Sequence, residues 1–516
     1  MADRLHLSRK HRRILETLLR EHLPDVEVWA YGSRVNGRSH DGSDLDLVLR
    51  GPGLEEIPVG RLNDFWDAVS ESLIPFLVEA RDWARLPDRF RREIESQHLE
   101  LCAPCSHPSC RWQKARLGDV IRLRRGHDLP KRLRVAGSFP VVSSSGISDS
   151  HAKAKVQGPG VIIGRYGTLG EVHFVRSDYW PLNTTLYVED FKGNDPRYVS
   201  YLLETLDVSP FSDKAAVPGL NRNHLHEAEV PFAAPAAEQR AIAHILGTLD
   251  DKIELNRRMN ETLQAMARAL FSSWFVDFEP VRAKMAGRDT GLTDDIAELF
   301  PSRLTASARG EIPSAWRVMP LGECFKLTMG QSPPGTSYND IGEGLPFFQG
   351  RTDFGFRFPA IRRFCTAPSR IARSDETLVS VRAPVGDINM AWAESCIGRG
   401  IAALRHHSLS STYTYYAVSA IHRDIAEFEH SGTVFGAITR KQFESLEVIE
   451  PDPATVRAFD LVAGPMDRCI RLNETESRNL ILMRQALLPK LISGELRVTE
   501  AVEAMQDATG RGTADV

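Results

Sequence analysis

The stretch from Leu246 to Trp274 reads LGTLDDKIELNRRMNETLQAMARALFSSW, and it places seam residues at alternating steps of three and four. The seam consists of Leu246, Leu249, Ile253, Asn256, Asn260, Leu263, Ala267, Leu270 and Trp274. This heptad spacing is typical of a helix that packs along its whole length against another helix. At 1.5 Å per residue, the stretch predicts a helix about 43 Å long, which exceeds one turn of B-DNA at about 34 Å.

The same pattern returns 217 residues later, where Asn473 takes the place of Asn256. The second seam consists of Ala463, Met466, Ile470, Asn473, Ser477, Leu480, Arg484, Leu487 and Leu491. Two such helices in one chain most simply pair antiparallel with each other. Polar residues near the middle of both seams would lower stability but fix the register. The alternative is that each helix packs only on its own domain.

An extended block of sequence precedes each helix, at residues 112–235 and 314–452. Each block contains a buried strand that runs into a tight loop, at Val161–Gly170 and at Leu378–Gly386. Near the end of each block, residues 219–225 parallel residues 437–443. The chain therefore describes one globular unit twice, each copy tied to a long helix, which suits the measurement of an extended partner such as DNA.

The loops of the two blocks contain side chains suited to base recognition. Arginine at a strand end can bind guanine through two hydrogen bonds, and Asn or Gln can bind adenine in the same way. We expect DNA contacts from Arg165, Tyr166, Thr168, Asn221, Arg222, Arg382, Arg440 and Lys441. The alternative is that these residues stabilise turns and face water.

The first hundred residues predict a separate domain. Gly32-Ser33 ends an alternating strand, and Asp44 and Asp46 begin the next one after a gap of ten residues. Residues two apart in a strand share a face, so both carboxylates point the same way. Mg²⁺ prefers such carboxylates together with phosphate oxygens, and a Gly-Ser turn lets backbone amides approach a phosphate. An isolated Asp-x-Asp would be a solvated strand edge, but the preceding Gly-Ser favours a nucleotide site.

This pattern resembles the minimal nucleotidyltransferases of the DNA polymerase beta superfamily, whose signature is Gly-Ser, ten residues and Asp-x-Asp. The resemblance implies a nucleoside triphosphate bound as a magnesium complex and a nucleotidyl group passed to a hydroxyl. Asp44 and Asp46 would hold the metal, and Gly32 and Ser33 would hold the phosphates. Glu79 stands where the family has a third catalytic carboxylate, usually Asp.

Residues 112 to about 498 resemble the DNA-specificity subunits of type I restriction-modification enzymes. The resemblance is carried by residues 237–246, 271–278 and 487–496, and by the way both blocks open, with Trp112 before Leu117-Gly118-Asp119 and Trp316 before Leu321-Gly322-Glu323. It implies two target recognition domains that each read half of a split site in double-stranded DNA, with the helices fixing the gap. It also implies docking of modification subunits, expected to be two, which methylate adenine with S-adenosylmethionine, and of restriction motor subunits. Consistently, the chain lacks Walker-type and adenine-methylase motifs.

The expected fold is therefore a multidomain α+β chain. An α/β nucleotidyltransferase domain is followed by two mixed α/β recognition domains separated by two long antiparallel coiled-coil helices. The boundaries are 1–101 for the first domain, 102–111 for a Cys-rich linker, 112–235 and 236–279 for the first recognition domain and helix, 280–313 for a linker, 314–452 and 453–496 for the second pair, and 497–516 for a disordered tail. Cys102, Cys105, His107 and Cys110 are either zinc ligands or part of a thiol-bearing linker.

Composition limits these interpretations only loosely. The 516 residues are 42% hydrophobic and 26% charged, with a net charge of −4 that does not by itself indicate a polyanion partner. Seven cysteines indicate a reducing compartment, and no apolar run approaches a membrane span, so we expect a cytoplasmic protein without a membrane partner.

Two alternative functions remain. One is a nucleotidyltransferase acting on RNA or protein and delivered to DNA by the repeats, and the other makes the first domain an inactive, antitoxin-like binding module.

Overall fold

The computed structural model describes residues 5–23, 26–36, 39–40, 42–102, 112–211, 218–382, 384–430, 436–498 and 501. Two compact units are formed, residues 1–247 with 486–516, and residues 248–485. Of the candidate zinc ligands, Cys105, His107 and Cys110 lie outside the described residues, as does most of the expected disordered tail. None of the described helices is long and apolar enough to cross a membrane.

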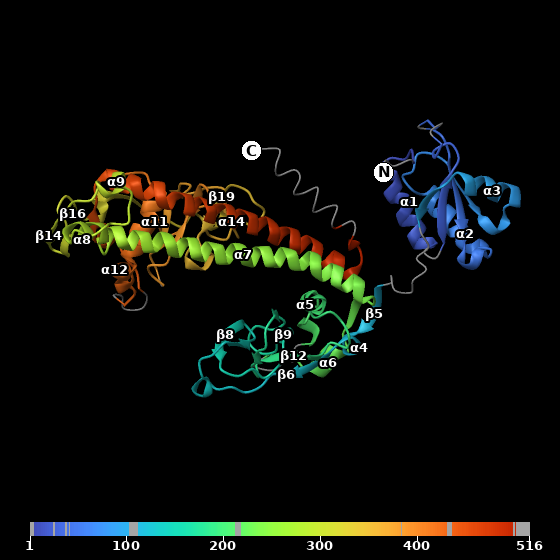
Figure 1. The fold of residues 1–516 in the computed structure, drawn as a ribbon, viewed down its shortest axis with the longest axis horizontal. Helices are drawn as coiled ribbons and strands as arrows, with labels where there is room; N and C mark the ends of the chain where they lie inside the picture. The colour runs from blue at the N-terminus through green and yellow to red at the C-terminus, as the bar shows by residue number, and fades with distance from the viewer. Residues whose placement is uncertain are drawn as a thin grey trace. The chain divides into compact units, whose positions relative to one another are not determined.

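The N-terminal domain is a four-stranded sheet with helices on both faces (Figure 1). Its strand order is β3-β2-β1-β4, with β2 parallel to β3 and β1 antiparallel to both of its neighbours. The elements are α1 (Arg9–His22), β1 (Glu27–Tyr31), β2 (Leu45–Arg50), α2 (Val59–Ser70), β3 (Val78–Asp82), α3 (Asp88–Ser96) and β4 (Leu99–Cys102). Alternate residues of β1 face opposite ways. Val28 and Ala30 pack in the core formed with α1 and α2, whereas Trp29 and Tyr31 pack with α3.

The first recognition domain is built on a central sheet of order β10-β9-β12-β6. Its strands are β5 (Trp112–Arg116), β6 (Arg122–Arg125), β7 (Phe139–Ser143), β8 (Gly146–His151), β9 (Gly160–Gly164), β10 (Val172–Val175), β11 (Trp180–Pro181), β12 (Thr185–Asp190) and β13 (Glu229–Ala233). Its helices are α4 (Leu117–Val120), α5 (Pro196–Glu204) and α6 (Arg222–His226). The central strand β9 is buried over its whole length, as the apolar run in the sequence predicts.

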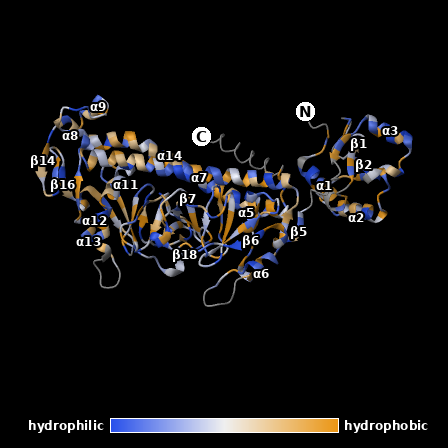
Figure 2. Ribbon diagram, turned by 60° about the horizontal axis from the view of Figure 1, so that its bottom comes forward, coloured by the Kyte–Doolittle hydropathy of each residue, from blue (hydrophilic) through white to orange (hydrophobic). Residues whose placement is uncertain are grey.

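The second recognition domain repeats this topology, with a central sheet of order β23-β22-β25-β17. Its strands are β16 (Arg317–Pro320), β17 (Phe325–Met329), β18 (Tyr338–Asn339), β19 (Leu345–Phe348), β20 (Phe364–Cys365), β21 (Ile371–Ala372), β22 (Thr377–Ser380), β23 (Ile388–Met390), β24 (Ser395–Ile397), β25 (Ile401–His406) and β26 (Glu447–Glu450). Its helices are α10 (Leu321–Cys324), α11 (Ser411–Ala420), α12 (His422–Ala426) and α13 (Arg440–Glu444). In Figure 2 the strands of the recognition domains are coloured largely as apolar. The shared strand order confirms that the two blocks are copies of one unit.

The long helices α7 (Ala236–Phe275) and α14 (Pro453–Ser493) lie side by side (Figure 1). Within residues 248–485 the contacts pair rising numbers on α7 with falling numbers on α14, so the helices are antiparallel. The pairs are Asp250 with Arg484 at 2.6 Å, Asn256 with Ser477 at 3.2 Å and Asn260 with Asn473 at 2.8 Å. Each of the expected seam positions is buried or half-buried, whereas Leu255, Leu461 and Leu472 are exposed. The alternative in which each helix packs only on its own domain is therefore wrong.

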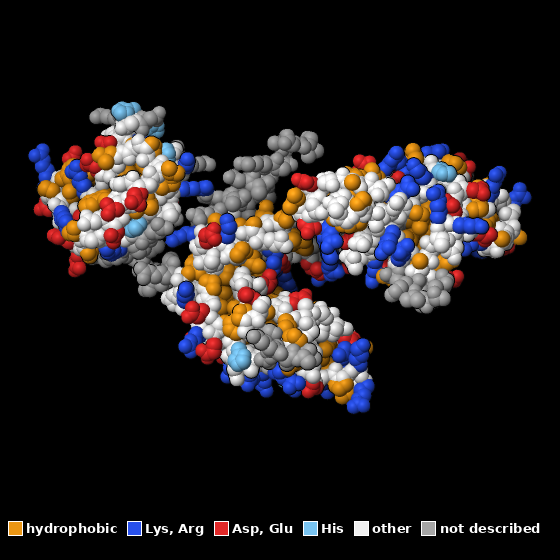
Figure 3. Space-filling model, turned by 180° about the vertical axis from the view of Figure 1, so that it is seen from behind, with side chains coloured by type: hydrophobic (Ala, Val, Ile, Leu, Met, Phe, Trp, Pro, Cys, Tyr) orange, Lys and Arg blue, Asp and Glu red, His pale blue; other side chains and the backbone are white. Residues whose placement is uncertain are grey.

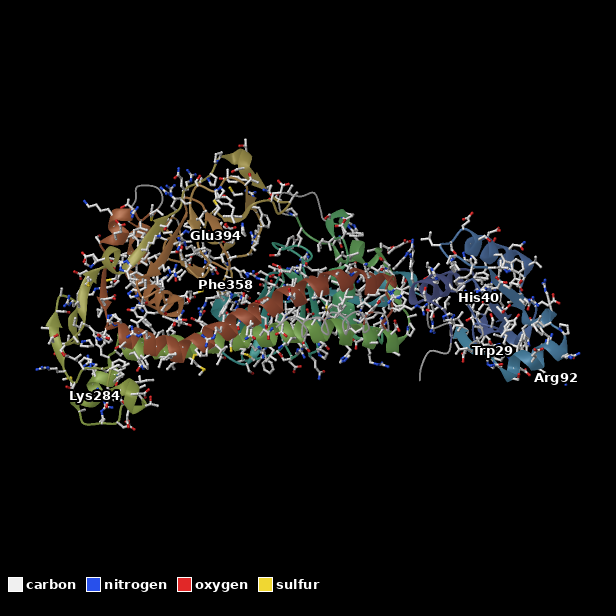
Figure 4. All side chains as sticks on the ribbon, turned by 90° about the horizontal axis from the view of Figure 1, so that it is seen from above. Trp29, His40, Arg92, Lys284, Phe358 and Glu394 are labelled. Atoms are coloured by element: carbon white, nitrogen blue, oxygen red, sulfur yellow. The ribbon has the colours of Figure 1, made fainter. Side chains whose placement is uncertain are left out.

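A buried arginine fastens the second recognition domain to both long helices. Arg357 is 1% exposed, and it donates to Gln264 of α7 at 3.2 Å and to Asp467 of α14 at 2.9 Å. Its guanidinium also lies 3.8 Å from the ring centroid of Tyr415 on α11. Phe358, the next residue, lies between this domain and the helices (Figure 4). One side chain thus joins three elements that are distant in the sequence.

The first recognition domain has its own attachments to the helix ends. Gln239 of α7 is 1% exposed and bonds both Asp195, the cap of α5, and Ala233, the last residue of β13. The indole nitrogen of Trp112 donates to the carbonyl oxygen of Ile492 near the end of α14, at 2.5 Å. Trp112 and Gln239 therefore attach the first recognition domain to the ends of the two long helices.

Residues 280–313, which we expected to be a linker, are folded. They contribute to α8 (Glu279–Met285) and form α9 (Asp294–Ala297), β14 (Leu304–Ser307) and β15 (Gly310–Pro313). Val281, Phe300 and Ile312 are buried in the core that contains Trp274 and Trp316. The prolines and glycines of this segment thus punctuate short elements, and its apolar residues give those elements a core to pack on.

Candidate nucleotide site and nucleic-acid interface

Three side chains form a row across the sheet of the N-terminal domain. Tyr31 on β1 pairs with Asp46 on β2, and Asp46 pairs with Glu79 on β3. Residues paired across neighbouring strands project from the same face of a sheet. Asp44 lies immediately before β2, two residues ahead of Asp46, and is exposed. The fold therefore places Asp46 beside Glu79 on one face of the sheet, with Asp44 just before the same strand.

The loop between the Gly-Ser turn and the carboxylates is closed by Arg34. This side chain is 3% exposed and donates from Nε and Nη2 to the carbonyl oxygen of Ser43, at 3.0 and 2.6 Å. Its Nη1 donates to the carbonyl oxygen of His6 at 2.7 Å. Because Ser43 precedes Asp44, these bonds hold the start of the Asp-x-Asp segment in place. Our reading of the sequence missed Arg34, although it directly follows the Gly-Ser turn.

Gly32 is required for close packing in the turn. Its φ is +78°, and a Cβ added there would lie 2.3 Å from a carboxylate oxygen of Asp46. No other residue could adopt this backbone conformation without strain and leave Asp46 where it is. The turn and the carboxylate are therefore directly apposed, as a site that must hold both a phosphate and its cation requires.

The row is electrostatically coupled. Burial, and then the neighbouring Glu79 carboxylate, raise the pKa of Asp46, while Arg81 partly offsets them. Arg81 donates to Glu79 at 2.7 Å, and this hydrogen bond is the main cause that raises the pKa of the arginine. Burial raises the pKa of Tyr31, whose hydroxyl is buried without a hydrogen-bond partner.

The residues present fit a magnesium nucleotide. Asp44 and Asp46 supply the carboxylate oxygens that Mg²⁺ prefers, and the Tyr31 hydroxyl is an orphaned buried donor on the same face. Within the described part of the chain, no three Asp, Glu, His or Cys side chains converge closely enough to form a metal centre on their own. Glu79, the third expected carboxylate, instead accepts a hydrogen bond from Arg81 at 2.7 Å.

The recognition domains share a closed loop at the end of the central strand. In the first domain Gly170 donates to the carbonyl oxygen of Gly164 at 3.0 Å, and in the second Gly386 donates to that of Ser380 at 2.9 Å. Because Gly164 and Ser380 are equivalent, the residue of the first domain that corresponds to Arg382 is Tyr166 and not Arg165. Tyr166 bridges to Gly219 just as Arg382 bridges to Ala437. Arg165 is equivalent to Val381, so the two arginines expected to contact DNA stand one position apart in the two domains.

The first loop is organised around an arginine–tyrosine stack. The Arg165 guanidinium lies 4.5 Å from the ring centroid of Tyr166, and Nη2 donates to its hydroxyl at 3.3 Å. The ring lies over Gly219, where an added Cβ would approach it to 2.3 Å. Thr168 is exposed at the tip of the loop, and Arg382 is exposed in the second domain. These side chains are within reach of a partner molecule.

The second matched segment forms a short capped helix in each domain. Asn221 caps α6 by accepting from the backbone N–H of Asn223, and Thr439 caps α13. Asn221, one of the expected DNA contacts, therefore has a structural role, because its side-chain amide oxygen accepts this capping hydrogen bond. Arg222, Arg440 and Lys441 are exposed in the first turns of these helices, and Arg440 also bonds Glu444 at 2.7 Å.

A basic run in the first recognition domain was missed by our reading of the motifs. Between residues 112 and 135 the chain has eight Lys and Arg against two Asp. Arg122, Arg124, Arg125, Lys131 and Arg132 are exposed. Figure 3 shows Lys and Arg side chains gathered on the surfaces of both recognition domains. A basic run of this kind is typical of proteins that bind nucleic acid, although Arg122 and Arg124 both pair with Glu189. A local charge count would have found the run despite the net charge of −4.

Comparison with known proteins decides the family. Residues 110–265 match the type I restriction modification DNA specificity domain. A putative type I restriction enzyme MjaX specificity subunit from Methanocaldococcus jannaschii is 30% identical over 320 residues, which cover 59% of this chain and 69% of that protein. This chain belongs to the type I restriction enzyme specificity subunits. In addition, this specificity subunit carries a nucleotidyltransferase domain, matched over residues 9–99.

Two further likenesses concern the separate parts of this specificity subunit. A probable protein adenylyltransferase MntA from Haemophilus influenzae is 37% identical over 90 residues, covering 17% of this chain and 75% of that protein. The crystal structure of a type I restriction-modification S subunit from M. genitalium superimposes with a TM-score of 0.51 at 17% identity, covering 75% of this chain and 97% of that one. The second likeness concerns the fold alone.

Proposed function

We propose that this specificity subunit reads a bipartite sequence in double-stranded DNA, one half with each recognition domain. The observation that carries the proposal is the repetition of one sheet order and one closed loop in both domains, each joined to a long helix. The loops expose Thr168, Arg222, Arg382, Arg440 and Lys441, and the Arg165–Tyr166 stack lies beside them. Arginine and lysine supply both phosphate contacts and guanine recognition.

The paired helices would fix the spacing between the two half-sites. Direct bonds tie α7 to α14 within residues 248–485, including the polar pair of Asn260 and Asn473 at 2.8 Å. A pair of helices held in one register along a coiled-coil seam is a stiff spacer. Shortening it would therefore change the distance that the subunit tolerates between half-sites.

The outer faces of the same helices would dock the partner subunits in the cytoplasm. Large apolar side chains are exposed there, among them Leu255, Met259 and Met266 on α7 and Leu461 and Leu472 on α14. Exposed apolar residues along a helix pair are typical of a protein-binding surface. We expect two modification subunits, which use S-adenosylmethionine to methylate adenine, together with restriction motor subunits.

The experiment for DNA reading is methylome sequencing of cells that carry the subunit with its modification partner. Because Arg165 and Arg382 lie in different domains, Arg165→Ala and Arg382→Ala should each relax one half-site. Each variant is the control for the other, since its second half-site must stay unchanged. Loss of specificity in both halves by one substitution would contradict independent reading.

For the N-terminal domain we propose transfer of a nucleotidyl group from a nucleoside triphosphate to a hydroxyl of a protein. The bond between the α- and β-phosphates breaks, pyrophosphate leaves, and the hydroxyl oxygen, after losing its proton to solvent, bonds the α-phosphorus. A bound Mg²⁺ would supply positive charge to the phosphates. Asp44 and Asp46 would hold this cation, the amides of Gly32 and Ser33 would bind phosphate, and Arg34 would keep the loop closed. The likeness to a probable protein adenylyltransferase favours a protein acceptor over RNA.

Label transfer from radioactive nucleotides tests this activity, with Asp44→Ala and Asp46→Ala as controls. We expect labelling of a protein by the wild type and none by either variant. Equal background labelling by all three proteins would leave a second candidate function, that of an inactive, antitoxin-like binding module. The Glu79–Arg81 bond favours that candidate, because it engages the third carboxylate.

A further inference from the structure

Arg81 lies within the row of candidate nucleotide-site residues. It follows Glu79 by two residues on β3, so both side chains leave the same face of the sheet. Its guanidinium donates to Glu79 at 2.7 Å, and its charge acts on both Asp46 and Tyr31. A fixed positive charge thus stands beside the carboxylates before any cation arrives.

The Tyr31 hydroxyl is a second polar group on this face that is placed to bind a ligand. Tyr31 is 8% exposed, and its hydroxyl has no hydrogen-bond partner although it is buried. A buried polar group without a partner lowers stability, so such groups are usually satisfied by a ligand or water. Strand pairing sets Tyr31 beside Asp46, so a ligand that satisfies the hydroxyl would lie on the face that carries this carboxylate.

We propose that this site takes one divalent cation with its nucleotide, held by Asp44 and Asp46, and that Arg81 provides the second positive charge. Arg81 would bind Glu79 through one edge of its guanidinium and a phosphate oxygen through the other. The Tyr31 hydroxyl would donate to the same phosphate group. The inference rests on the proposed function only in assuming that a nucleoside triphosphate binds.

The chemistry of the guanidinium supports this arrangement. Its five N–H donors lie in a planar fork, so it can bind a carboxylate and a phosphate at once, and its charge is permanent. Three free carboxylates could hold two divalent cations, but a carboxylate already neutralised by Arg81 attracts a second cation weakly. The longer side chain of glutamate lets Glu79 reach the arginine on its own strand, which a shorter aspartate would do less readily.

A simpler explanation is that Glu79 and Arg81 form an ordinary surface ion pair. Their side chains are 40% and 48% exposed, and such pairs contribute little to stability. If this explanation held, removal of the arginine charge would leave nucleotide binding unchanged. The two explanations therefore differ in a measurable property other than catalysis.

The experiment counts bound Mn²⁺ and measures nucleotide affinity on the full chain, using a non-hydrolysable ATP analogue. Titration calorimetry gives the affinity, and electron paramagnetic resonance gives the number of ions. We expect one Mn²⁺ per chain in the wild type, one in Glu79→Gln, and a loss of at least about tenfold in Mn²⁺ affinity in Asp46→Asn, the order expected when a charge-assisted contact is removed.

For Arg81→Gln we expect nucleotide affinity to fall by about tenfold, and for Tyr31→Phe by a smaller factor. Arg92→Gln is the matched control, because Arg92 is an exposed arginine on α3 that lies at the outer edge of the domain (Figure 4). Unfolding curves confirm that each variant is folded. Two ions in the wild type, loss of the ion in Glu79→Gln, or unchanged affinity in Arg81→Gln would each overturn the inference.

The inference and the proposed transfer activity can fail separately. One bound ion without any label transfer would support the inference and remove the transfer activity. Label transfer with two bound ions would support the activity and overturn the inference. A wild-type chain that binds no nucleotide would overturn both.

Discussion

Asn256 of α7 donates from Nδ2 to a carboxylate oxygen of Glu476 on α14 at 2.8 Å and to the hydroxyl of Ser477 at 3.2 Å. At the next seam position, four residues along, Asn260 accepts from Asn473 at 2.8 Å. Asn256 is fully buried, and its own carbonyl oxygen has no partner. The middle of the helix pair is thus polar where an apolar seam would be more stable, and such residues specify register at the expense of stability.

Asn256→Leu should raise the thermal midpoint of the chain by a few degrees. The substitution removes a buried acceptor that lacks a partner, and it adds apolar contact along the seam. The measurement is thermal unfolding followed by circular dichroism at 222 nm. The neighbouring Leu255→Gln is the control, because Leu255 is 52% exposed and should change stability by less than about 0.5 kcal/mol. A lower midpoint for Asn256→Leu would show that the polar contacts stabilise the pair.

Deletion of residues 248–254 together with 479–485 should shorten the DNA spacer. The deletion takes one heptad from each helix, removes both Asp250 and its partner Arg484, and keeps the Asn260–Asn473 pair. At 1.5 Å per residue the helix pair becomes about 10 Å shorter, which corresponds to about three base pairs. Methylome sequencing reads the spacer directly. An unchanged spacer in a folded variant would mean that the helices do not set it.

Arg34→Ala should open the loop of the N-terminal domain. Three hydrogen bonds from a charged donor to the carbonyls of His6 and Ser43 are lost, and a buried site is vacated. We expect a loss of at least about 2 kcal/mol in the stability of this domain. Hydrogen exchange of the Ser43 to Leu47 amides is the measurement. Arg34→Lys should recover part of the protection, since one of the contacts can re-form, and equal exchange in all three proteins would contradict the role of Arg34.

The pKa of Asp46 gives a stability that depends on pH. Its folded pKa is raised above the ordinary value of 3.8, chiefly by burial, so the folded state binds the proton more tightly than the unfolded state. Stability should therefore fall as pH rises from 3.8 through the raised folded pKa, and the loss persists at neutral pH. Asp46→Asn should remove this loss and be more stable than the wild type at pH 7, with the difference vanishing below pH 3.8. Urea unfolding at both pH values measures it.

The seam and the duplication could be predicted from the sequence because both are periodic. Heptad steps fix which side of a helix faces its partner, and all the seam positions from Leu246 to Trp274 are shielded as expected. The Asp-x-Asp spacing likewise fixes a shared face, so the placement of Asp46 beside Glu79 follows once β2 and β3 pair.

Features set by tertiary packing could not be predicted in the same way. The one-residue shift between Arg165 and Arg382 depends on which residue closes each loop, and that appears only in the hydrogen bonds of Gly164 and Ser380. The capping role of Asn221 depends on where α6 begins. The folding of residues 280–313 depends on a core supplied by distant residues such as Trp316.

Arg357 has a consequence for anyone who wishes to exchange reading domains between subunits. Arg357 donates to Tyr416 of its own domain, but its other two hydrogen-bond acceptors, Gln264 and Asp467, belong to the long helices. A graft cut at the domain boundary alone would leave a buried cation without the two acceptors that the helices supply. A chimera with a new target sequence should therefore carry position 357 and both helix positions from the same parent.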